Sequence, residues 1–276
     1  MSVQITTLLH RRPDLSTFLV HLTTAATFDP EANLRSILAT RTIEARSPYG
    51  LLRDLAQDRQ QSDPDLYQSQ LVVCLTETPL EHVWMMCENI ADRGHPLAPY
   101  GLAFSKPWAR DIGANPVWYI DTLRTGHRGR DWLNKALANI AKQTIRSGGE
   151  RYADPFNFTD GAQPETTADP LHWSPIAEIA PFIETMGPVG PVGDVRRREF
   201  WWEREWRFRG NLTFTWGEVV AVFAPAARHA DLRPALQEAL PPEDPPAILD
   251  PTWGLERMIA ALTDVPDEYA GPLPRY

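Results

Sequence analysis

The segment that most constrains this chain is residues 200–209, which read FWWEREWRFR. Three Trp and two Phe in ten residues favour a half-buried strand. Because a strand turns successive side chains to opposite faces, the spacing predicts Glu203, Glu205 and Arg207 on one face and the large aromatic side chains on the other. The two carboxylates would then lie about 7 Å apart along the strand.

Two interpretations of this face follow from the residues alone. Neighbouring carboxylates repel each other unless an opposite charge or a function holds them together. In the first interpretation the segment is a solvated edge strand whose Glu and Arg side chains pair with a neighbouring strand. In the second it is a catalytic strand in which Glu203 and Glu205 both act on a substrate, and Trp202 and Trp206 are either a shield against water or simply core.

Composition narrows the class of protein. The chain has 276 residues and a formal charge of −9, which argues against a generic nucleic-acid binder. Six arginines nonetheless crowd residues 196–209, and such a run is either a solvated face or a contact for a phosphate-bearing ligand at one cleft. No apolar run approaches 18 residues, so no membrane partner is expected. Cys74 and Cys87 lack metal or redox spacing and, without a signal peptide, indicate reduced core residues of a cytoplasmic protein.

The order of elements predicts an α+β fold. Strands are expected at 16–23, 70–75, 100–105 and 115–121, with a hairpin over 212–223. Helices are expected from an Asp29 N-cap, from a capping box at 78–81 to about 94, and over 131–146, 174–186, 232–240 and 252–262. A polar segment, 148–173, separates two of the helices. The predicted organisation is one domain over 1–240, followed by a Pro-rich link and a C-terminal helix packed on it (241–276).

The absence of several known motifs argues against metal and nucleotide-cradle sites. The sequence holds no HExxH pair, no GxSxG, no Walker motif and no GxGxxG, so neither a metal site nor these nucleotide cradles are indicated. The remaining candidates are His21 near the end of the first strand, the strand that begins at Tyr100, and the Glu203–Glu205 pair. A single histidine at a strand end is either a structural residue or a ligand-binding one.

The order of several short motifs resembles a known family. These are VHLT, NLRSIL, VVCLTETPLEHV, YGLAFSKPWARDIGANPVWYID and EREWRF, and the resemblance covers residues 18–223 apart from the segment 148–173. Together they resemble the abortive-infection AbiGi-type family of phage-resistance proteins and the wider set of bacterial proteins with an EWR strand. More distantly, the opening resembles DNA-modifying ADP-ribosyltransferases of the DarT type. The resemblance to these transferases implies an ADP-ribosyltransferase-like split β-sheet core surrounded by helices.

The resemblance also implies NAD as co-substrate and a set of NAD-binding residues. His21 and Thr23 would bind the ribose, and the strand from Tyr100 to Ser105 would line the nicotinamide pocket. We therefore expect the His21 strand and the Glu205 strand to converge on one cleft.

Catalytic roles follow from the same resemblance. Glu205 would be the catalytic residue, and Glu203 would face the acceptor of ADP-ribose. The arginine cluster, and not the resemblance, suggests that Arg207 and Arg209 contact the pyrophosphate or the acceptor. The implied activity is an NAD-dependent ADP-ribosyltransferase or NAD glycohydrolase in phage defence. The alternative is a non-catalytic antitoxin or binding protein of a defence system with the same fold, which acts through a cognate partner protein.

Overall fold

The main element of the fold is a mixed β-sheet. The structure is a computed structural model that describes residues 12–24, 29–90, 93–121, 175–189, 196–239 and 245–265. In this part of the chain the sheet has eight strands in the order β13-β12-β5-β1-β4-β10-β6, with β3 paired to β4. Their bounds are β1 Phe18–Thr24, β3 Ser47–Pro48, β4 Leu71–Thr76, β5 Leu97–Ser105, β6 Asn115–Pro116, β10 Glu205–Arg209, β12 Val219–Phe223 and β13 Ala247–Leu249. Neighbours are antiparallel except β12 and β13.

Smaller sheets and helices surround this one. β2 Thr42–Ile43 pairs with β11 Leu212–Thr213, and β7 Trp118–Asp121, β8 Ile183–Val189 and β9 Arg196–Arg198 form a further sheet. The α-helices are α2 Pro30–Thr40, α3 Arg53–Asp58, α4 Pro64–Ser69, α5 Lys106–Asp111, α7 Pro175–Ile179, α8 His229–Ala239 and α9 Leu255–Leu262. The 3-10 helices are η1 Leu80–Cys87, η3 Ala180–Phe182, η4 Trp201–Glu203, η5 Trp216–Glu218 and η6 Ala226–Arg228. The protein is therefore a mixed α+β fold, as the sequence predicts.

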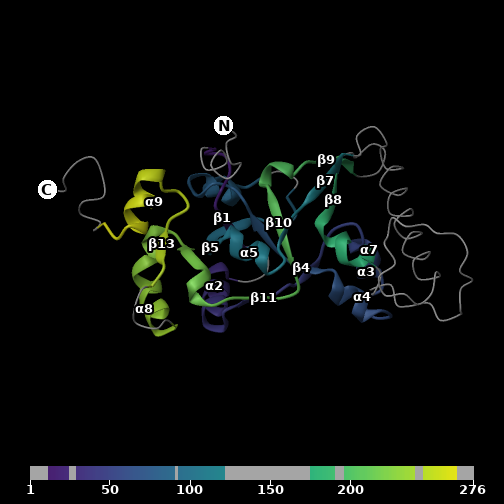
Figure 1. The fold of residues 1–276 in the computed structure, drawn as a ribbon, viewed down its shortest axis with the longest axis horizontal. Helices are drawn as coiled ribbons and strands as arrows, with labels where there is room; N and C mark the ends of the chain where they lie inside the picture. The colour runs from purple at the N-terminus through teal and green to yellow at the C-terminus, as the bar shows by residue number, and fades with distance from the viewer. Residues whose placement is uncertain are drawn as a thin grey trace, which may run out of the picture.

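Side-chain alternation gives the main sheet two buried faces. Leu19 and Leu102 lie in the core cluster that includes residues of α2 and α8, whereas their neighbours Val20 and Ala103 lie in the cluster that includes residues of η1 and α9. A third cluster joins α3, α4, α7 and β8. In Figure 1, α8 and α9 lie at one end of the molecule beside β13, and α3, α4 and α7 lie at the other. No helix in the described ranges is long and apolar enough to cross a bilayer.

The segment after β4 differs from the predicted helix. It is a 3-10 helix that ends at Cys87, and no side chain caps it. The predicted capping box fails because Thr78 is held by Thr76 instead. The Thr78 amide donates to the Thr76 hydroxyl at 3.1 Å, and the two hydroxyl oxygens are 2.8 Å apart. By contrast, Asp29 does cap α2, as predicted.

Further predictions are wrong where distant segments pair. The expected helix over 174–186 ends at Ile179, and β8 then runs beside β7. The expected hairpin over 212–223 is absent from the described chain, because β11 pairs with β2 and β12 pairs with β5 and β13. The predicted strand over 115–121 is divided between two sheets as β6 and β7. The predicted helix over 131–146 and the polar segment 148–173 lie outside the described residues.

A buried carboxylate joins α2 to the C-terminal half of the chain. Glu31, 8% exposed, accepts hydrogen bonds from Arg228 Nε at 2.7 Å and Nη2 at 3.0 Å. It also accepts from Arg35 Nη2 at 2.8 Å and from the Tyr100 hydroxyl at 3.3 Å. The hydrogen bonds from Arg228 are the main cause that lowers the pKa of Glu31 to about 2.

This cluster predicts a stability change at acid pH. A carboxyl group whose pKa is lowered by folding stabilises the fold above its unfolded pKa, and this contribution is lost as pH falls. For Glu31 the loss should occur between about pH 4.5 and about pH 2. Urea unfolding of wild type and Glu31→Gln should therefore differ at pH 7 and converge toward pH 2. The control is Glu256→Gln on the exposed side of α9, and an equal effect of both variants at pH 7 would contradict the prediction.

Candidate active site

A cavity opens where the main sheet separates between β1 and β4. The two strands pair only at Val20 and Thr76, whereas β1 pairs along most of its length with β5. Residues 20–24 and 72–76 then line the two sides of a cavity of about 860 Å³. This size suits a small-molecule or cofactor site. β10, the other neighbour of β4, brings Glu205 and Arg207 to the same cavity.

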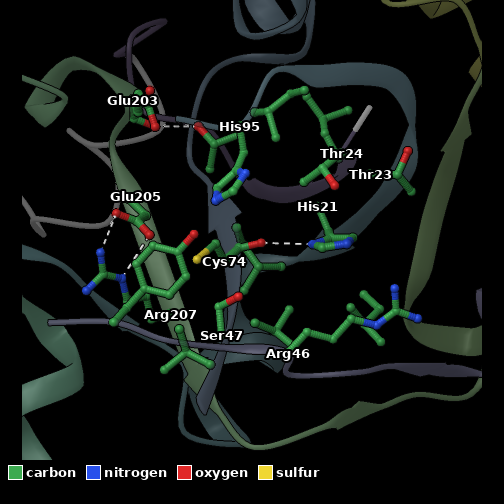
Figure 2. A pocket seen from close by; sticks show the side chains of 18 of the residues that line it. His21, Thr23, Thr24, Arg46, Ser47, Cys74, His95, Glu203, Glu205 and Arg207 are labelled. Carbon is green, nitrogen blue, oxygen red and sulfur yellow. Dashed lines mark hydrogen bonds and ion pairs between the residues drawn. The ribbon is translucent and has the colours of Figure 1, made fainter. Parts of the chain in front are cut away.

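His21 bridges the opening in the sheet. Its Nδ1 lies 2.9 Å from the Cys74 carbonyl oxygen. Figure 2 marks this contact with a dashed line. Because a carbonyl can only accept, Nδ1 carries the proton and Nε2 of the neutral ring is left as an acceptor. Burial lowers the pKa of His21, although the bond to Cys74 opposes this effect. His21 is therefore a neutral imidazole at pH 7.

A glycine on β5 allows His21 to adopt this position. A Cβ atom at Gly101 would lie 2.0 Å from the His21 carbonyl oxygen, well inside van der Waals contact. Any larger residue at this position would push β1 away from β5. Gly101 is therefore required for the close packing of the strand that carries His21.

The partly buried Glu205 and the fully buried Arg207 form an ion pair on one face of β10, as the alternation of the sequence predicts. Arg207 Nε donates to Glu205 Oε1 at 2.8 Å, and Nη2 donates to Oε2 at 3.0 Å. Arg207 is only 1% exposed. Its remaining contacts are the Pro181 carbonyl at 2.6 Å, the Glu184 carboxylate at 3.2 Å and the ring of Tyr49, whose centroid is 4.9 Å from the guanidinium carbon.

These contacts decide the charge of Glu205. Burial by itself would raise the pKa of this carboxyl group, but the charge of Arg207 and hydrogen bonds from Arg207, Cys74 and Tyr119 outweigh it. The pKa of Glu205 is consequently lowered, so the group is ionised at pH 7. A carboxylate held by several donors in a protein interior is both fixed in place and negatively charged.

Two neighbours of Glu205 remain protonated. The Tyr119 hydroxyl donates to Glu205 Oε2 at 2.9 Å, and burial together with the charge of Glu205 raises the pKa of Tyr119. Burial, reinforced by the charge of Glu205, also raises the pKa of the Cys74 thiol. Cys74 is thus a weak donor and not a nucleophilic thiolate.

The position of Glu203 corrects the prediction of one continuous strand. Glu203 belongs to η4, and Arg204 has a left-handed backbone with φ of 50°, so β10 begins only at Glu205. The bond from the Thr76 hydroxyl to the Glu203 carbonyl, at 2.5 Å, holds this turn against β4. The Glu203 side chain still lines the cavity, where Arg93 Nη2 binds it at 2.7 Å.

The other predicted NAD-binding residues are divided between two places. Thr23 lines the cavity, and its hydroxyl donates to the Pro30 carbonyl at 3.4 Å. Tyr100 and Ser105 are not among the described residues that line it. Tyr100 packs instead against the core cluster that includes residues of α2 and α8 and binds Glu31. The structure therefore brings together His21, Thr23 and the two glutamates but leaves Tyr100 and Ser105 apart.

The charges of the cavity wall nearly balance. Five carboxylates and four guanidiniums line it, namely Glu44, Asp54, Glu184, Glu203 and Glu205 with Arg46, Arg53, Arg93 and Arg207. In Figure 2, Arg46 lies on the opposite side of the view from Glu205 and Arg207. Across the described ranges no group of three His, Cys, Asp or Glu side chains is arranged to hold a metal ion.

Three residues at Glu205 were not singled out from the sequence as site residues. Tyr119 lies within the quoted motif that ends at Asp121, but nothing in the motif gave it a role, and Glu184 lies where a helix was expected. Cys74 was interpreted only as core. The one signal available was that the two glutamates and Arg207 share a strand face and need partners of opposite charge, but nothing in the sequence shows which distant residues join them.

Comparison of this chain with protein-family models, with curated proteins and with solved structures found no match.

The Arg207 network predicts unequal roles for two arginines on β10. Arg207→Leu leaves Glu205 and Glu184 buried without their cation, which typically costs 3–5 kcal/mol, so we expect about 4 kcal/mol lower free energy of unfolding. Arg209 is half exposed and lies 4.0 Å from Glu178, a surface pair. Arg209→Leu should therefore cost about 1 kcal/mol or less. Urea denaturation measures both, and equal losses would contradict the structural role of Arg207.

Proposed function

We propose that this protein cleaves NAD at the nicotinamide–ribose bond and transfers ADP-ribose to an acceptor or to water. The observation that carries the proposal is that His21 and Glu205, 184 positions apart in the chain, line one cavity between separating strands. Its volume of about 860 Å³ is large enough for a dinucleotide-sized ligand. From the motif series we propose phage defence as the setting, with NAD as co-substrate.

The chemistry requires a fixed negative charge. When the bond between nicotinamide nitrogen and ribose carbon breaks, nicotinamide leaves with the bonding electrons and the ribose becomes an oxocarbenium ion. An ionised carboxylate held in place stabilises this ion most in the transition state. The acceptor or water then attacks the ribose carbon and loses a proton. Glu205 supplies the charge, because its donors hold it ionised in a buried wall.

His21 supplies a complementary binding group. A neutral imidazole whose Nδ1 is bound to a backbone carbonyl offers Nε2 as acceptor for a ribose hydroxyl. Glu203 is proposed to face the acceptor of ADP-ribose. It lies in the cavity wall, where it is paired with Arg93. Arg207 is not proposed as a pyrophosphate ligand, because its guanidinium is committed to Glu205, Glu184 and the Pro181 carbonyl.

One observation favours a second candidate function. Both oxygens of Glu205 already accept hydrogen bonds, from Arg207 and Tyr119. A carboxylate whose two oxygens are both occupied by hydrogen bonds can have a purely structural role. The second candidate is therefore a non-catalytic partner or antitoxin of a defence system, which would leave NAD intact.

Nicotinamide release tests the proposed chemistry. Glu205→Gln preserves volume but removes the charge that faces the oxocarbenium ion, so release should fall by about 100- to 1000-fold. NAD affinity, measured by calorimetry, should change little because the charge acts mainly in the transition state. Glu203→Gln should reduce transfer to an acceptor more than nicotinamide release.

The control is Glu256→Gln, which removes an exposed carboxylate on α9 and should match wild type. Thermal unfolding of each variant separates lost chemistry from lost folding. Equal release by wild type and Glu205→Gln removes Glu205 from the mechanism. NAD binding without any nicotinamide release by wild type supports the non-catalytic candidate.

A further inference from the structure

The sheet formed by β7, β8 and β9 contacts the proposed catalytic carboxylate of Glu205 directly. Tyr119 on β7 and Glu184 on β8 are register partners, so both side chains lie on the same face of that sheet. Tyr119 binds Glu205 Oε2 at 2.9 Å, and Glu184 binds Arg207 Nη2 at 3.2 Å. One pair of neighbouring residues therefore contacts both members of the ion pair on β10.

We propose that Tyr119 is the positioning residue of Glu205, with Glu184 holding Arg207 in the orientation that Glu205 needs. The inference rests on the proposed function for its catalytic consequence, although its structural part can be measured without turnover. Arg207 reaches Glu205 along the same strand, whereas Tyr119 reaches it from a different sheet. Contacts from both elements hold the carboxylate relative to its own strand and to the β7–β8–β9 sheet, whereas Arg207 by itself holds it only relative to β10.

The Tyr119 hydroxyl is suited to this task. It lines the cavity and stays a hydrogen-bond donor at all ordinary pH values, because burial and the nearby Glu205 charge raise the pKa of Tyr119. The groups that face the Glu205–Arg207 pair are Cys74 on β4, Tyr119 on β7, Glu184 on β8 and Glu203 on η4. Among these, Tyr119 has the one strong neutral donor, since a thiol donates weakly and carboxylates only accept.

Titration of Glu205 by carbon NMR of side-chain carboxyls tests the positioning role, with Glu205→Gln to assign the signal. Tyr119→Phe removes only the hydroxyl, and loss of a hydrogen bond to a charged group should raise the Glu205 midpoint by about one pH unit. The control is Tyr67→Phe, which removes a hydroxyl at the edge of the core and should leave the midpoint unchanged. An unchanged midpoint in Tyr119→Phe overturns the proposal.

A second variant covers the case in which Tyr119→Phe does not fold. Incorporation of a fluorinated, more acidic tyrosine at position 119 retains the ring and strengthens the hydrogen bond. It should lower the Glu205 midpoint, the opposite direction from Tyr119→Phe, and an unchanged midpoint again overturns the positioning role.

Kinetics separate this inference from the proposed function. If wild type releases nicotinamide, Tyr119→Phe should reduce kcat by about tenfold, leave KM for NAD nearly unchanged and move the acid limb of the pH–rate profile upward. A rise in KM alone would overturn positioning in favour of substrate binding by Tyr119. If wild type releases none, the proposed function fails, and the NMR midpoints alone decide whether Tyr119 positions Glu205.

Discussion

The buried guanidinium of Arg207 is the interaction on which much of this structure depends. It is among the largest side chains that are fully buried in the described chain. A buried cation must be matched by charge and hydrogen bonds, because an unpaired ion in the interior costs several kcal/mol. Arg207 meets this requirement with Glu205 on its own strand, Glu184 on β8 and the Pro181 carbonyl. These contacts hold β10 against the β7–β8–β9 sheet.

The same network forms one wall of the cavity. Two carboxylates and one guanidinium give the group of Glu205, Arg207 and Glu184 a formal charge of −1. Electrostatic effects are strong in such a wall because little water screens them. This charge favours a cationic group, and the proposed reaction would supply one as the nicotinamide ring or the oxocarbenium ion. Stability and the proposed activity thus share the same residues, whereas the Glu31 cluster joins α2 to η6 and lies apart from the residues that line the cavity.

Sequence periodicity predicted the local elements where burial alternates regularly. The strands found as β1, β4 and β5 were expected, and so were the Asp29 cap of α2 and the common face of Glu205 and Arg207. The predictions failed where a contact with a distant segment overrides local preference. The second half of the helix expected over 174–186 is instead strand β8, because β7 offers its backbone groups as partners. The strand over 200–209 begins late because Thr76 holds the Glu203 turn.

The sequence by itself determined which side chains share a strand face, which residues could cap a helix and which charged side chains needed partners. Those properties depend on neighbours only a few residues apart, whose geometry the backbone sets. Only the tertiary structure decided that β1 and β4 separate after Val20, that Tyr100 faces α2, and that Tyr119 and Glu184 meet the ion pair on β10. These outcomes depend on pairing between segments far apart in the chain, and such pairing leaves no periodic signal in the residues themselves.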